Sequence, residues 1–535
     1  MARRSALLVL CFLICLALRP QPVRGADSPR WGGRDDSNMV SQEKGLAESF
    51  EPGKKRPDGS GVDLATTKNV KWVARLGSQT YGTPTVAGGR VFVGCNDATM
   101  EDPKYKPTRG GAVKCFDEAT GKLLWELAIP RKEIKDPDFN FDDMDLGVCS
   151  SPTVDGDRVY LVTNRCEVLS LDVNGQANGN DGPFLDEGQY MAGKGKPPIP
   201  LGPTDGDIIW RYDMIEQSNV WPQDASNCSV LVHGRFVYVC TSNGVDRSHV
   251  RVPRPLAPSL IVLDKKTGRV VAQDDLKMGT RLFHGLWCSP SLAKVNGREL
   301  IFWGGGEGVC YAFEPVTATS ETPVPLRKVC WFDCNPPQYR FLNGKPRDYR
   351  SGDLRRHQDN KGDGSYVGPS EIIATPVCWH NRVYVTVGQD PSHGRGRGIL
   401  NCFDATQTGD VTKSGKIWSY DKIDRSISTV SIADGLLYAA DCCAGDVHCL
   451  DANTGQLLWV HHSGAEIWSS TFVADGKVYL GTKKSLQVLA AGRKEKLLGE
   501  IHLGSPIMCT PVAANGVLYV ASQKYLWAVQ AGKNP

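Results

Sequence analysis

Short apolar segments that alternate with polar residues recur along most of the chain, and a glycine-containing turn interrupts each of them. One such segment, at 153–162, reads Thr-Val-Asp-Gly-Asp-Arg-Val-Tyr-Leu-Val. Alternation with a period of two on both sides of an Asp-Gly pair predicts a β-hairpin. Comparable segments lie at 86–93, 153–162, 232–238, 292–302, 379–384, 432–438, 473–479 and 512–519. The pattern therefore predicts an all-β chain built from eight similar units.

A second element follows the hairpins and gives the units their length. The segments Cys115–Trp125 and Cys449–Trp459 each contain a strand that ends in Asp, a Thr-Gly turn and a strand that ends in Trp, and weaker copies lie at 262–268 and 402–418. Asp hydrogen-bonds its own backbone in such a turn, and Gly supplies the positive φ. Trp418 and Trp459 are 41 residues apart, a period typical of propellers. Four antiparallel strands in each unit predict an eight-bladed β-propeller, with the tryptophans packed between blades.

The two ends of the repeat are incomplete in complementary ways. Asn69–Trp72 resembles a fourth strand without the first three, and Tyr525–Val529 ends the last unit without its fourth strand. We expect these segments to pair and complete one blade, which closes the ring and hides its sheet edges. The predicted propeller spans 69–535. An N-terminal extension at 26–68, rich in Gly, Asp, Ser and Lys, is expected to wrap around it or to stay partly mobile.

The repeated phrase Asp-Ala-x-Thr-Gly-x-x-Leu-Trp, seen at 451–459, resembles the tryptophan-docking repeat of the pyrroloquinoline quinone (PQQ) propellers. The resemblance covers roughly Val70 to Gln530. That superfamily includes quinoprotein alcohol dehydrogenases and also the non-catalytic lipoprotein BamB of the outer-membrane assembly machinery. The resemblance therefore implies the fold, whereas function depends on sites that are specific to each member.

The N-terminus predicts export. Arg3 and Arg4 precede the apolar run 6–18, and small residues follow near Gly25, as in a signal peptide at 1–25. The run is too short to span a membrane, and no other segment predicts a transmembrane helix. We therefore expect a monomer in the periplasm or outside the cell. The formal net charge is +3 with acidic and basic residues interspersed, which disfavours nucleic acid as a partner.

The 18 cysteines do not follow a simple disulfide pattern. Each unit opens with a small residue and usually a Pro, as at Ser151-Pro152, and we call the place of that Pro the Pro-equivalent position. Two residues before it every unit has a small residue, which is Cys228, Cys288 or Cys509 in three of the units. The other units carry Gly82, Ser150, Ala374, Ser428 and Ser470 there. A small residue is expected where eight inner strands converge, and buried thiols behave as small apolar groups. Cys330 and Cys334 are the pair predicted to form a local disulfide.

Candidate chemistry lies where the long loops are expected, on the face that leads into the inner strands. Six residues before the Pro-equivalent position stand three carboxylates and a histidine, namely Asp224, His284, Asp424 and Glu466. If these converge, they would hold a divalent cation or supply a general base. The other interpretation is a solvated polar rim. Trp221, Trp287 and Trp468 lie close by and would either stack on a planar ligand or pack in the core.

The adjacent pair Cys442–Cys443 lies in a turn on the same face. Quinoprotein dehydrogenases resemble this chain in having adjacent cysteines, and the resemblance implies a disulfide that stacks on the quinone ring. The pair here lies in the sixth unit, whereas that family has it near the start, and the following Asn-Arg-Gly motif is absent. The pair is therefore either a cofactor contact or a coincidence.

A second candidate metal site lies in the loop 172–182, which is dense in oxygen ligands. Its candidate ligands are Asp172, Asn174, Asn178, Asn180 and Asp181. The loop lacks the twelfth-position Glu of an EF-hand, so a turn-rich insertion without metal is the other interpretation.

Two hypotheses for function remain. The first is an exported, non-catalytic propeller that binds an envelope protein or a carbohydrate through its loop face. The second is a PQQ- and Ca²⁺-dependent quinoprotein alcohol dehydrogenase, in which a carboxylate takes the alcohol proton and the quinone accepts hydride.

Overall fold

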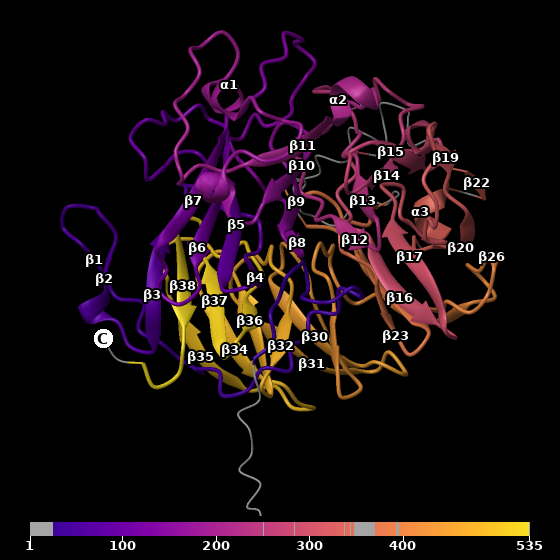
Figure 1. Ribbon diagram of the computed structural model, residues 1–535. Helices are drawn as coiled ribbons and strands as arrows, with labels where there is room; N and C mark the ends of the chain where they lie inside the picture. Colours follow the sequence, from indigo (N-terminus) through magenta and orange to yellow (C-terminus); the bar gives the residue numbers. More distant parts are fainter. Residues whose placement is uncertain are drawn as a thin grey trace, which may run out of the picture.

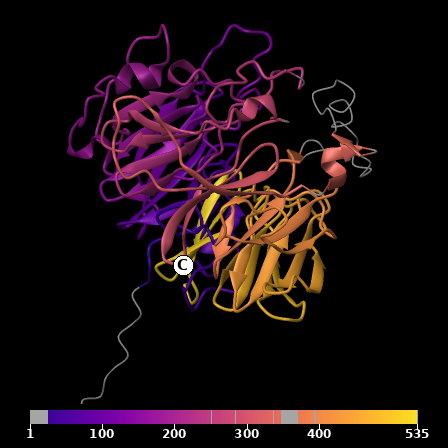
Figure 2. The same ribbon diagram turned by 90° about the vertical axis from the view of Figure 1, so that its right-hand side faces the viewer.

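The computed structural model describes residues 25–249, 251–282, 284–335, 337–342, 344–346, 370–391 and 395–533. Eight sheets of mainly antiparallel strands are arranged around a central axis (Figure 1), which confirms the predicted eight-bladed propeller. The view turned by 90° shows the early blades and the late blades on opposite sides of the ring (Figure 2). The predicted signal peptide falls outside the described residues, except for Gly25, and so does most of the loop before Ser370.

Each blade has an inner strand of three to five residues and three further strands. Blades 1 to 4 consist of β4 (Thr85–Ala87), β5 (Arg90–Asn96), β6 (Gly111–Asp117) and β7 (Leu123–Ile129); β8 (Thr153–Asp155), β9 (Arg158–Val162), β10 (Glu167–Asp172) and β11 (Ile208–Asp213); β12 (Leu231–His233), β13 (Phe236–Cys240), β14 (Leu260–Asp264) and β15 (Val270–Gln273); β16 (Ser291–Val295), β17 (Arg298–Gly304), β18 (Val309–Phe313) and β20 (Lys328–Asp333).

Blades 5 to 8 repeat this arrangement. They consist of β23 (Val377–Trp379), β24 (Arg382–Val387), β25 (Ile399–Asp404) and β27 (Lys416–Tyr420); β28 (Ser431–Ala433), β29 (Leu436–Ala440), β30 (Asp446–Asp451) and β31 (Leu457–His462); β32 (Phe472–Ala474), β33 (Lys477–Gly481), β34 (Leu486–Ala490) and β35 (Leu497–Ile501); β36 (Val512–Ala514), β37 (Val517–Ala521), β38 (Tyr525–Val529) and β3 (Val70–Arg75).

The remaining elements lie in insertions and at the periphery. They are the parallel additions β19 (Val324–Pro325) and β26 (Gly409–Asp410), the two-stranded ribbons β1 (Lys54–Lys55) with β2 (Val62–Asp63) and β21 (Phe341–Leu342) with β22 (Lys345–Pro346), the helices α1 (Glu187–Ala192), α2 (Met214–Gln217) and α3 (Pro337–Arg340), and the 3-10 turns η1 (Leu64–Thr66), η2 (Gly175–Asn178) and η3 (Met278–Thr280). None of the helices among the described residues is long and apolar enough to cross a membrane.

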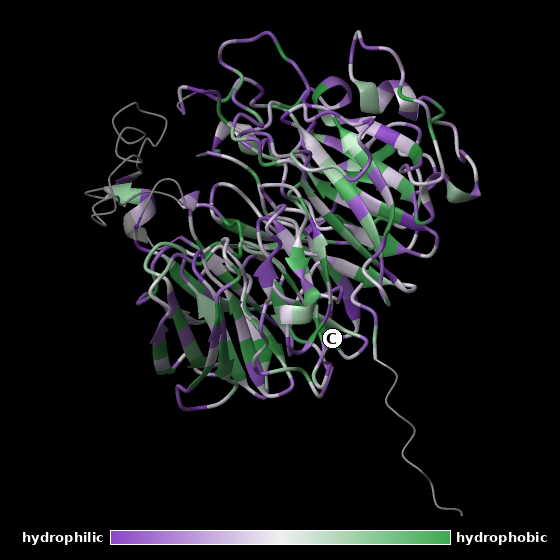
Figure 3. Cartoon of the chain, turned by 90° about the vertical axis from the view of Figure 1, so that its left-hand side faces the viewer, coloured by the Kyte–Doolittle hydropathy of each residue, from purple (hydrophilic) through white to green (hydrophobic). Residues whose placement is uncertain are grey.

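Blade 8 closes the ring as expected. Strand β3 pairs antiparallel with β38, with Val73 opposite Trp527 and Ala74 opposite Leu526. The first and last strands of the propeller therefore share one sheet, so that neither leaves an open edge toward the other. Apolar residues concentrate in the strands and polar residues in the connections (Figure 3).

The tryptophans that end the fourth strands join successive blades. In five blades the indole N–H donates to a backbone carbonyl of the next blade at 2.9–3.2 Å. The acceptor lies shortly after the third strand of that blade, in the connection to its fourth strand. The pairs are Trp72 with Glu118, Trp125 with Val173, Trp210 with Lys265, Trp418 with Ala452 and Trp459 with Gly492. The glycine of the turn lies directly against the docked indole. A Cβ at Gly455 would come within 2.6 Å of Cδ2 of Trp418, so a larger residue has no room there.

The cysteine predictions have two outcomes. Cys228, Cys288 and Cys509 are buried free thiols at the axis, as expected. The predicted bridge between Cys330 and Cys334 is wrong, since both thiols are free. Cys330 lies within the extended strand β20 and Cys334 directly follows it. Four residues of extended chain span roughly 13 Å, well beyond the ~7 Å Cα separation that a disulfide tolerates.

The N-terminal extension contacts all eight blades. Each blade shares at least one hydrogen bond with the extension, in its inner strand or in the residues next to that strand. The bonded pairs are Ser28 with Val86, Pro29 with Val154, Arg30 with Val232, Asp35 with Leu292, Trp31 with Thr375, Asn38 with Ile432, Ser41 with Val473 and Glu43 with Gly516. The extension thus encircles one end of the axial channel and ties the blades to one another there.

Candidate functional site

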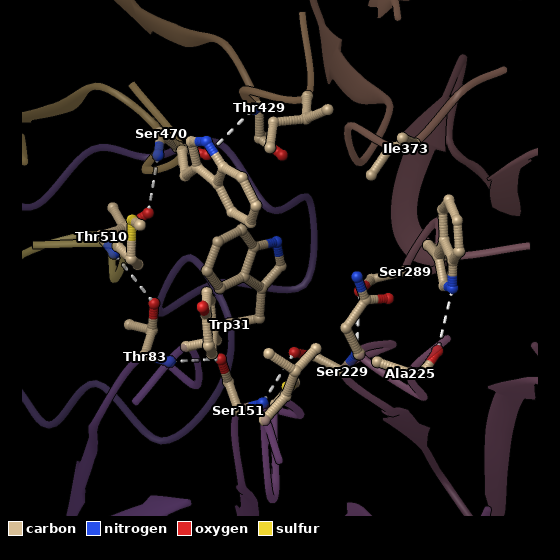
Figure 4. A pocket seen from close by; sticks show the side chains of 18 of the residues that line it. Trp31, Thr83, Ser151, Ala225, Ser229, Ser289, Ile373, Thr429, Ser470 and Thr510 are labelled. Carbon is tan, nitrogen blue, oxygen red and sulfur yellow. Dashed lines mark hydrogen bonds between the residues drawn. The ribbon is translucent and has the colours of Figure 1, made fainter. Parts of the chain in front are cut away.

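The axial channel opens into a pocket of about 190 Å³. All eight blades contribute to its wall, and Trp31 of the N-terminal extension lies at the centre of the ring of side chains (Figure 4). Trp31 is half-buried and donates its indole N–H to Oγ1 of Thr375 at 3.1 Å. Because the extension encircles the hairpin end of the channel, we describe Trp31 as the floor of the pocket and the loop face as its mouth.

A ring of hydroxyl side chains surrounds Trp31. In seven of the eight positions around the axis, the backbone N–H of one ring residue donates to the hydroxyl of the next at 2.9–3.2 Å. The ring consists of Thr83, Ser151, Ser229, Ser289, Thr375, Thr429, Ser470 and Thr510. These bonds satisfy the N–H groups that the inner strands direct at their neighbours, so the ring stabilises the axis.

The ring also corrects the alignment of the seventh unit. Its members lie one residue before the Pro-equivalent position in the other units, and Ser470 is the member from blade 7. The Pro-equivalent residue there is Thr471 and the small residue two before it is Ser469. The sequence-based placement of Ser470 and Glu466 was therefore shifted by one residue. Blade 7 begins with Thr471-Phe472 and has no proline to mark the position.

The mouth of the pocket is largely apolar on one side. Met144, Leu146, Ile427 and Met508 line it together with the rings of Tyr81 and Trp468, whereas Trp287 comes from blade 4 and bonds the carbonyl of Ala225. The rings of Tyr81 and Trp468 lie 6.0 Å apart. Lys483 Nζ lies 5.1 Å from the Trp468 ring, within the range of a cation–π contact.

Two carboxylates, Asp224 and Asp390, line the opposite side of the mouth. Asp224 precedes β12, adopts φ 51°, and accepts a hydrogen bond from Asn140 Nδ2 at 3.0 Å. Burial, and next the charge of Asp390, raise the pKa of Asp224 to about 7. Asp390 follows β24 in blade 5, so the sheets of two different blades bring the two carboxylates together.

Three further titratable side chains stand behind these carboxylates. His284 is fully buried, and its Nε2 lies 2.9 Å from Nδ1 of His249. Its Nδ1 lies 3.7 Å from Oε1 of Glu371, which is 1% exposed. Burial, and next the charge of Asp390, raise the pKa of Glu371 well above its usual range. A backbone bridge between Glu371 and Gly388 holds this residue beside the segment that carries Asp390.

Of the four side chains predicted to rim the channel, the structure brings Asp224 and His284 together. Asp424 forms an ion pair with Arg395 at 2.8 Å, and Glu466 forms one with Lys483. Neither lines the pocket. Because loop lengths differ between blades, an equal sequence offset does not give an equal height along the axis.

Some of the predicted aromatic and cysteine residues line the pocket and others lie outside it. Trp287 and Trp468 line the pocket, whereas Trp221 is buried and its ring packs edge-on against Phe139 at 5.1 Å. Cys442 and Cys443 carry free thiols outside the pocket lining, and Cys443 Sγ faces the carbonyl of Pro391 at 3.7 Å. The pair thus stands next to a residue of the pocket wall.

In the loop 172–182, Asp172 and Asp181 lie together with Asp207, a residue that the sequence did not single out. Asn174 bonds Arg90, Asn178 bonds Asp181, and Asn180 bonds Glu187. Burial, followed by the charges of Glu187, Asp172 and Asp181, raises the pKa of Asp207 to about 7. The asparagines therefore serve mainly to fix the loop, and the carboxylates remain a candidate cation site.

Sequence reasoning missed Trp31, Asp390, Glu371 and His249. One signal for Glu371 was present, because it directly follows Ser370, the residue that the six-residue offset selected in unit 5. Asp390 lies in the long connection after β24 that was expected at this face. Nothing in the sequence indicated that Trp31, in a polar extension, reaches the axis.

The fold and its repeated Trp contacts define an eight-bladed PQQ-like propeller. The model of one family, described as outer membrane protein assembly factor BamB, matches residues 98–317 and 396–498. This match spans more than half of the chain, and the chain belongs to that family. None of the curated proteins matches it.

Three solved structures are similar to this chain at low sequence identity. BamB from Moraxella catarrhalis is 13% identical with a TM-score of 0.49, over 87% of this chain and 98% of that chain. Quinohemoprotein alcohol dehydrogenase from Comamonas testosteroni is 14% identical with a TM-score of 0.47, over 95% and 82%. The computationally designed Ika8 protein is 12% identical with a TM-score of 0.45, over 92% and 99%. At these values the likeness concerns the fold, and no activity follows from it.

Proposed function

We propose that the chain is an exported, non-catalytic binding scaffold that takes an apolar segment of an envelope protein into the mouth of its axial channel. One observation carries this proposal. The pocket ends on Trp31, its wall comes from all eight blades, and apolar and aromatic side chains dominate one side of its mouth. A concave apolar pocket with a few polar groups is the usual form of a binding site.

The choice of a protein segment over a carbohydrate rests on the chemistry of the mouth. Met144 and Met508 are flexible and polarisable, and such side chains adapt to different apolar partners. Most hydroxyl oxygens of the ring below them already accept backbone N–H bonds around the axis, which leaves mainly their O–H groups for recognising sugar hydroxyls. Membership of a family described as an assembly factor agrees with this choice, and the predicted signal peptide supports export.

A PQQ-dependent dehydrogenase fits the pocket less well. PQQ carries three carboxylates, and a buried anion needs a cationic partner. The described residues that line the pocket include Asp224 and Asp390 but no Lys or Arg. Cys442 and Cys443 lie outside this lining. A quinone-dependent step is therefore not part of the proposal, and we expect the chain to retain no quinone absorbance after it is mixed with micromolar PQQ and Ca²⁺ and freed of unbound PQQ.

The binding proposal is tested with a random peptide library displayed on phage and selected against the full chain. Enriched peptides are expected to share an apolar core. Leu146→Arg places a charge in the pocket and is expected to weaken their binding by about tenfold or more, since burying an unpaired charge is costly.

The matched control is Leu497→Arg, which changes an exposed leucine in β35 of blade 7, outside the pocket. This variant should bind the same peptides within about twofold. Peptide binding that survives Leu146→Arg unchanged would place recognition outside the pocket and overturn the proposal. Photo-crosslinking from position 144 in intact cells, with Lys266 on the opposite face as the control, then identifies the natural partner.

A further inference from the structure

Three side chains from three consecutive blades place metal-binding atoms close together at the channel mouth. One ligand atom each of Asp224, His284 and Asp390 lies within 4.8 Å of the other two. The backbone holds this arrangement. The N–H of Gln223 bonds the carbonyl of Ser242, and the N–H of Val245 bonds the carbonyl of His284, at 3.1 and 3.0 Å. The loop before blade 3 and the loop before blade 4 are thus tied to the same strand connection.

A buried carboxylate stands behind the histidine. Glu371 faces His284 Nδ1 at 3.7 Å, and its carboxylate oxygens lie near the backbone N–H of Gly285 but outside the geometry of a full hydrogen bond to any described residue. A histidine that binds a metal through one nitrogen usually donates its other N–H to a carboxylate. Glu371 is therefore positioned to fix the tautomer of His284 in which Nε2 carries no proton and is able to bind a metal.

The charges at the site also call for a cation. Three carboxylates, those of Asp224, Asp390 and Glu371, lie around His284. Arg425 supplies a positive charge near Glu371. A bound divalent ion would offset the repulsion that remains.

We propose that Asp224, His284 and Asp390 bind a divalent transition-metal ion of the zinc type at the mouth of the channel, with Glu371 as the residue that positions His284. Imidazole combined with carboxylate suits zinc and its neighbours, whereas calcium prefers oxygen ligands alone. His249 Nδ1, which lies 2.9 Å from His284 Nε2, supplies a fourth ligand in the His249 tautomer that carries its proton on Nε2 and leaves the Nδ1 lone pair for the metal.

Two other groups of titratable side chains among the described residues are less suited to a metal. Asp441 in the group with Asp446 and His448 accepts backbone N–H bonds from Gly445 and Asp446. Asp172 in the group with Asp181 and Asp207 pairs with Arg158 at 2.7 Å. Asp224 likewise accepts one bond, from Asn140, so what distinguishes its group is Glu371, the buried carboxylate that faces His284.

The test is calorimetric titration of the EDTA-treated full chain with Zn²⁺, followed by Co²⁺ absorption spectroscopy to report the ligands. One tight site is expected. His284→Gln and Asp390→Asn should each weaken Zn²⁺ binding about 100-fold or more, since each removes a ligand. Glu371→Gln should weaken it by about 10- to 100-fold with unchanged stoichiometry, because it alters only the orientation of His284. Near-ultraviolet circular dichroism verifies that each variant is folded.

Asp424→Asn and His448→Gln are the matched controls, one at the same loop face and one in a different titratable group. Both should bind Zn²⁺ as the unmodified chain does. Zn²⁺ binding that His284→Gln leaves unchanged, a preference for Ca²⁺ over Zn²⁺, or no binding tighter than about 10 µM would each overturn the inference. The titration uses the chain alone, so its outcome is independent of whether the pocket binds a peptide.

Discussion

Trp31 donates a hydrogen bond to Thr375 across 344 residues of sequence. This contact links an extension that lies outside the repeats to blade 5 and sets the indole in the ring of axial hydroxyls. The channel therefore ends in a side chain that no blade contributes. Stability of the axis and depth of the pocket depend on the same residue.

Trp31→Ala is expected to admit water to the axial ring. Amide N–H groups of the ring, such as those of Thr83 and Thr429, should then exchange with deuterium about tenfold faster, because local opening becomes easier. Hydrogen-exchange mass spectrometry of peptides around 80–86 and 426–432 measures this change. Peptides from the outer strand β7 serve as the internal control, and equal protection of the ring in both proteins would contradict the assignment of Trp31 as the floor.

Gly455→Ala tests the contact between a turn and the tryptophan of the preceding blade. Gly455 has φ 73°, and its Cβ would lie 2.6 Å from the Trp418 ring. Gly476 has φ 69° with nothing within 4 Å of the corresponding position. Gly476→Ala should cost about 1 kcal/mol of unfolding free energy from backbone strain alone.

Gly455→Ala should cost about 1–3 kcal/mol more than Gly476→Ala, since it also displaces a packed ring. Denaturant unfolding of the two variants measures the difference. Equal costs would show that the ring accommodates a methyl group and that the turn glycine serves backbone conformation only.

Asp224→Asn is expected to change how stability depends on pH. Burial and Asp390 raise the pKa of Asp224 from 3.8 to about 7, so the folded chain keeps a proton that the unfolded chain releases. Between these values the folded state binds more protons, and stability falls as pH rises. Asp224→Asn removes this contribution. Between pH 4 and pH 8 the free energy of unfolding of the variant should therefore rise, relative to that of the unmodified chain, by on the order of 2–4 kcal/mol.

Thermal or denaturant unfolding in EDTA across this range measures the effect, since a bound cation would stabilise the ionised form. Parallel pH profiles for the two proteins would show that Asp224 does not hold the proton in the folded state.

Cys443 is expected to react first among the thiols of the folded chain. It is half-buried, and the hydrogen bond from Cys442 lowers its pKa. Burial raises the pKa of Cys95 to about 11, and the other described cysteines are also buried. Alkylation depends on the thiolate and on access. Timed alkylation with peptide mass spectrometry should find Cys443 modified first, and Cys443→Ser should remove the fast phase. A fast phase that persists in that variant would assign it to another thiol.

The sequence determined the repeating part of this protein. Alternation, the Asp and Gly of each turn, and the closing Trp predicted blades, their number and the closure of β3 on β38. These signals are local, because a strand, a turn or a docking tryptophan is specified within about 40 residues by steric and hydrogen-bonding preferences that recur. The small residues at the axis followed from the same repetition, although blade 7, which lacks proline, was misaligned by one residue.

Tertiary structure alone decided how the non-repeating segments meet. Asp224, His284, Glu371 and Asp390 come from loops of unequal length in three blades, so their heights along the axis depend on backbone contacts that no sequence offset encodes. Trp31 reaches the axis because the extension follows the inner strands around the ring. A propeller fixes its blades through near-neighbour contacts and leaves its mouth to loops whose positions are set only when the ring is closed.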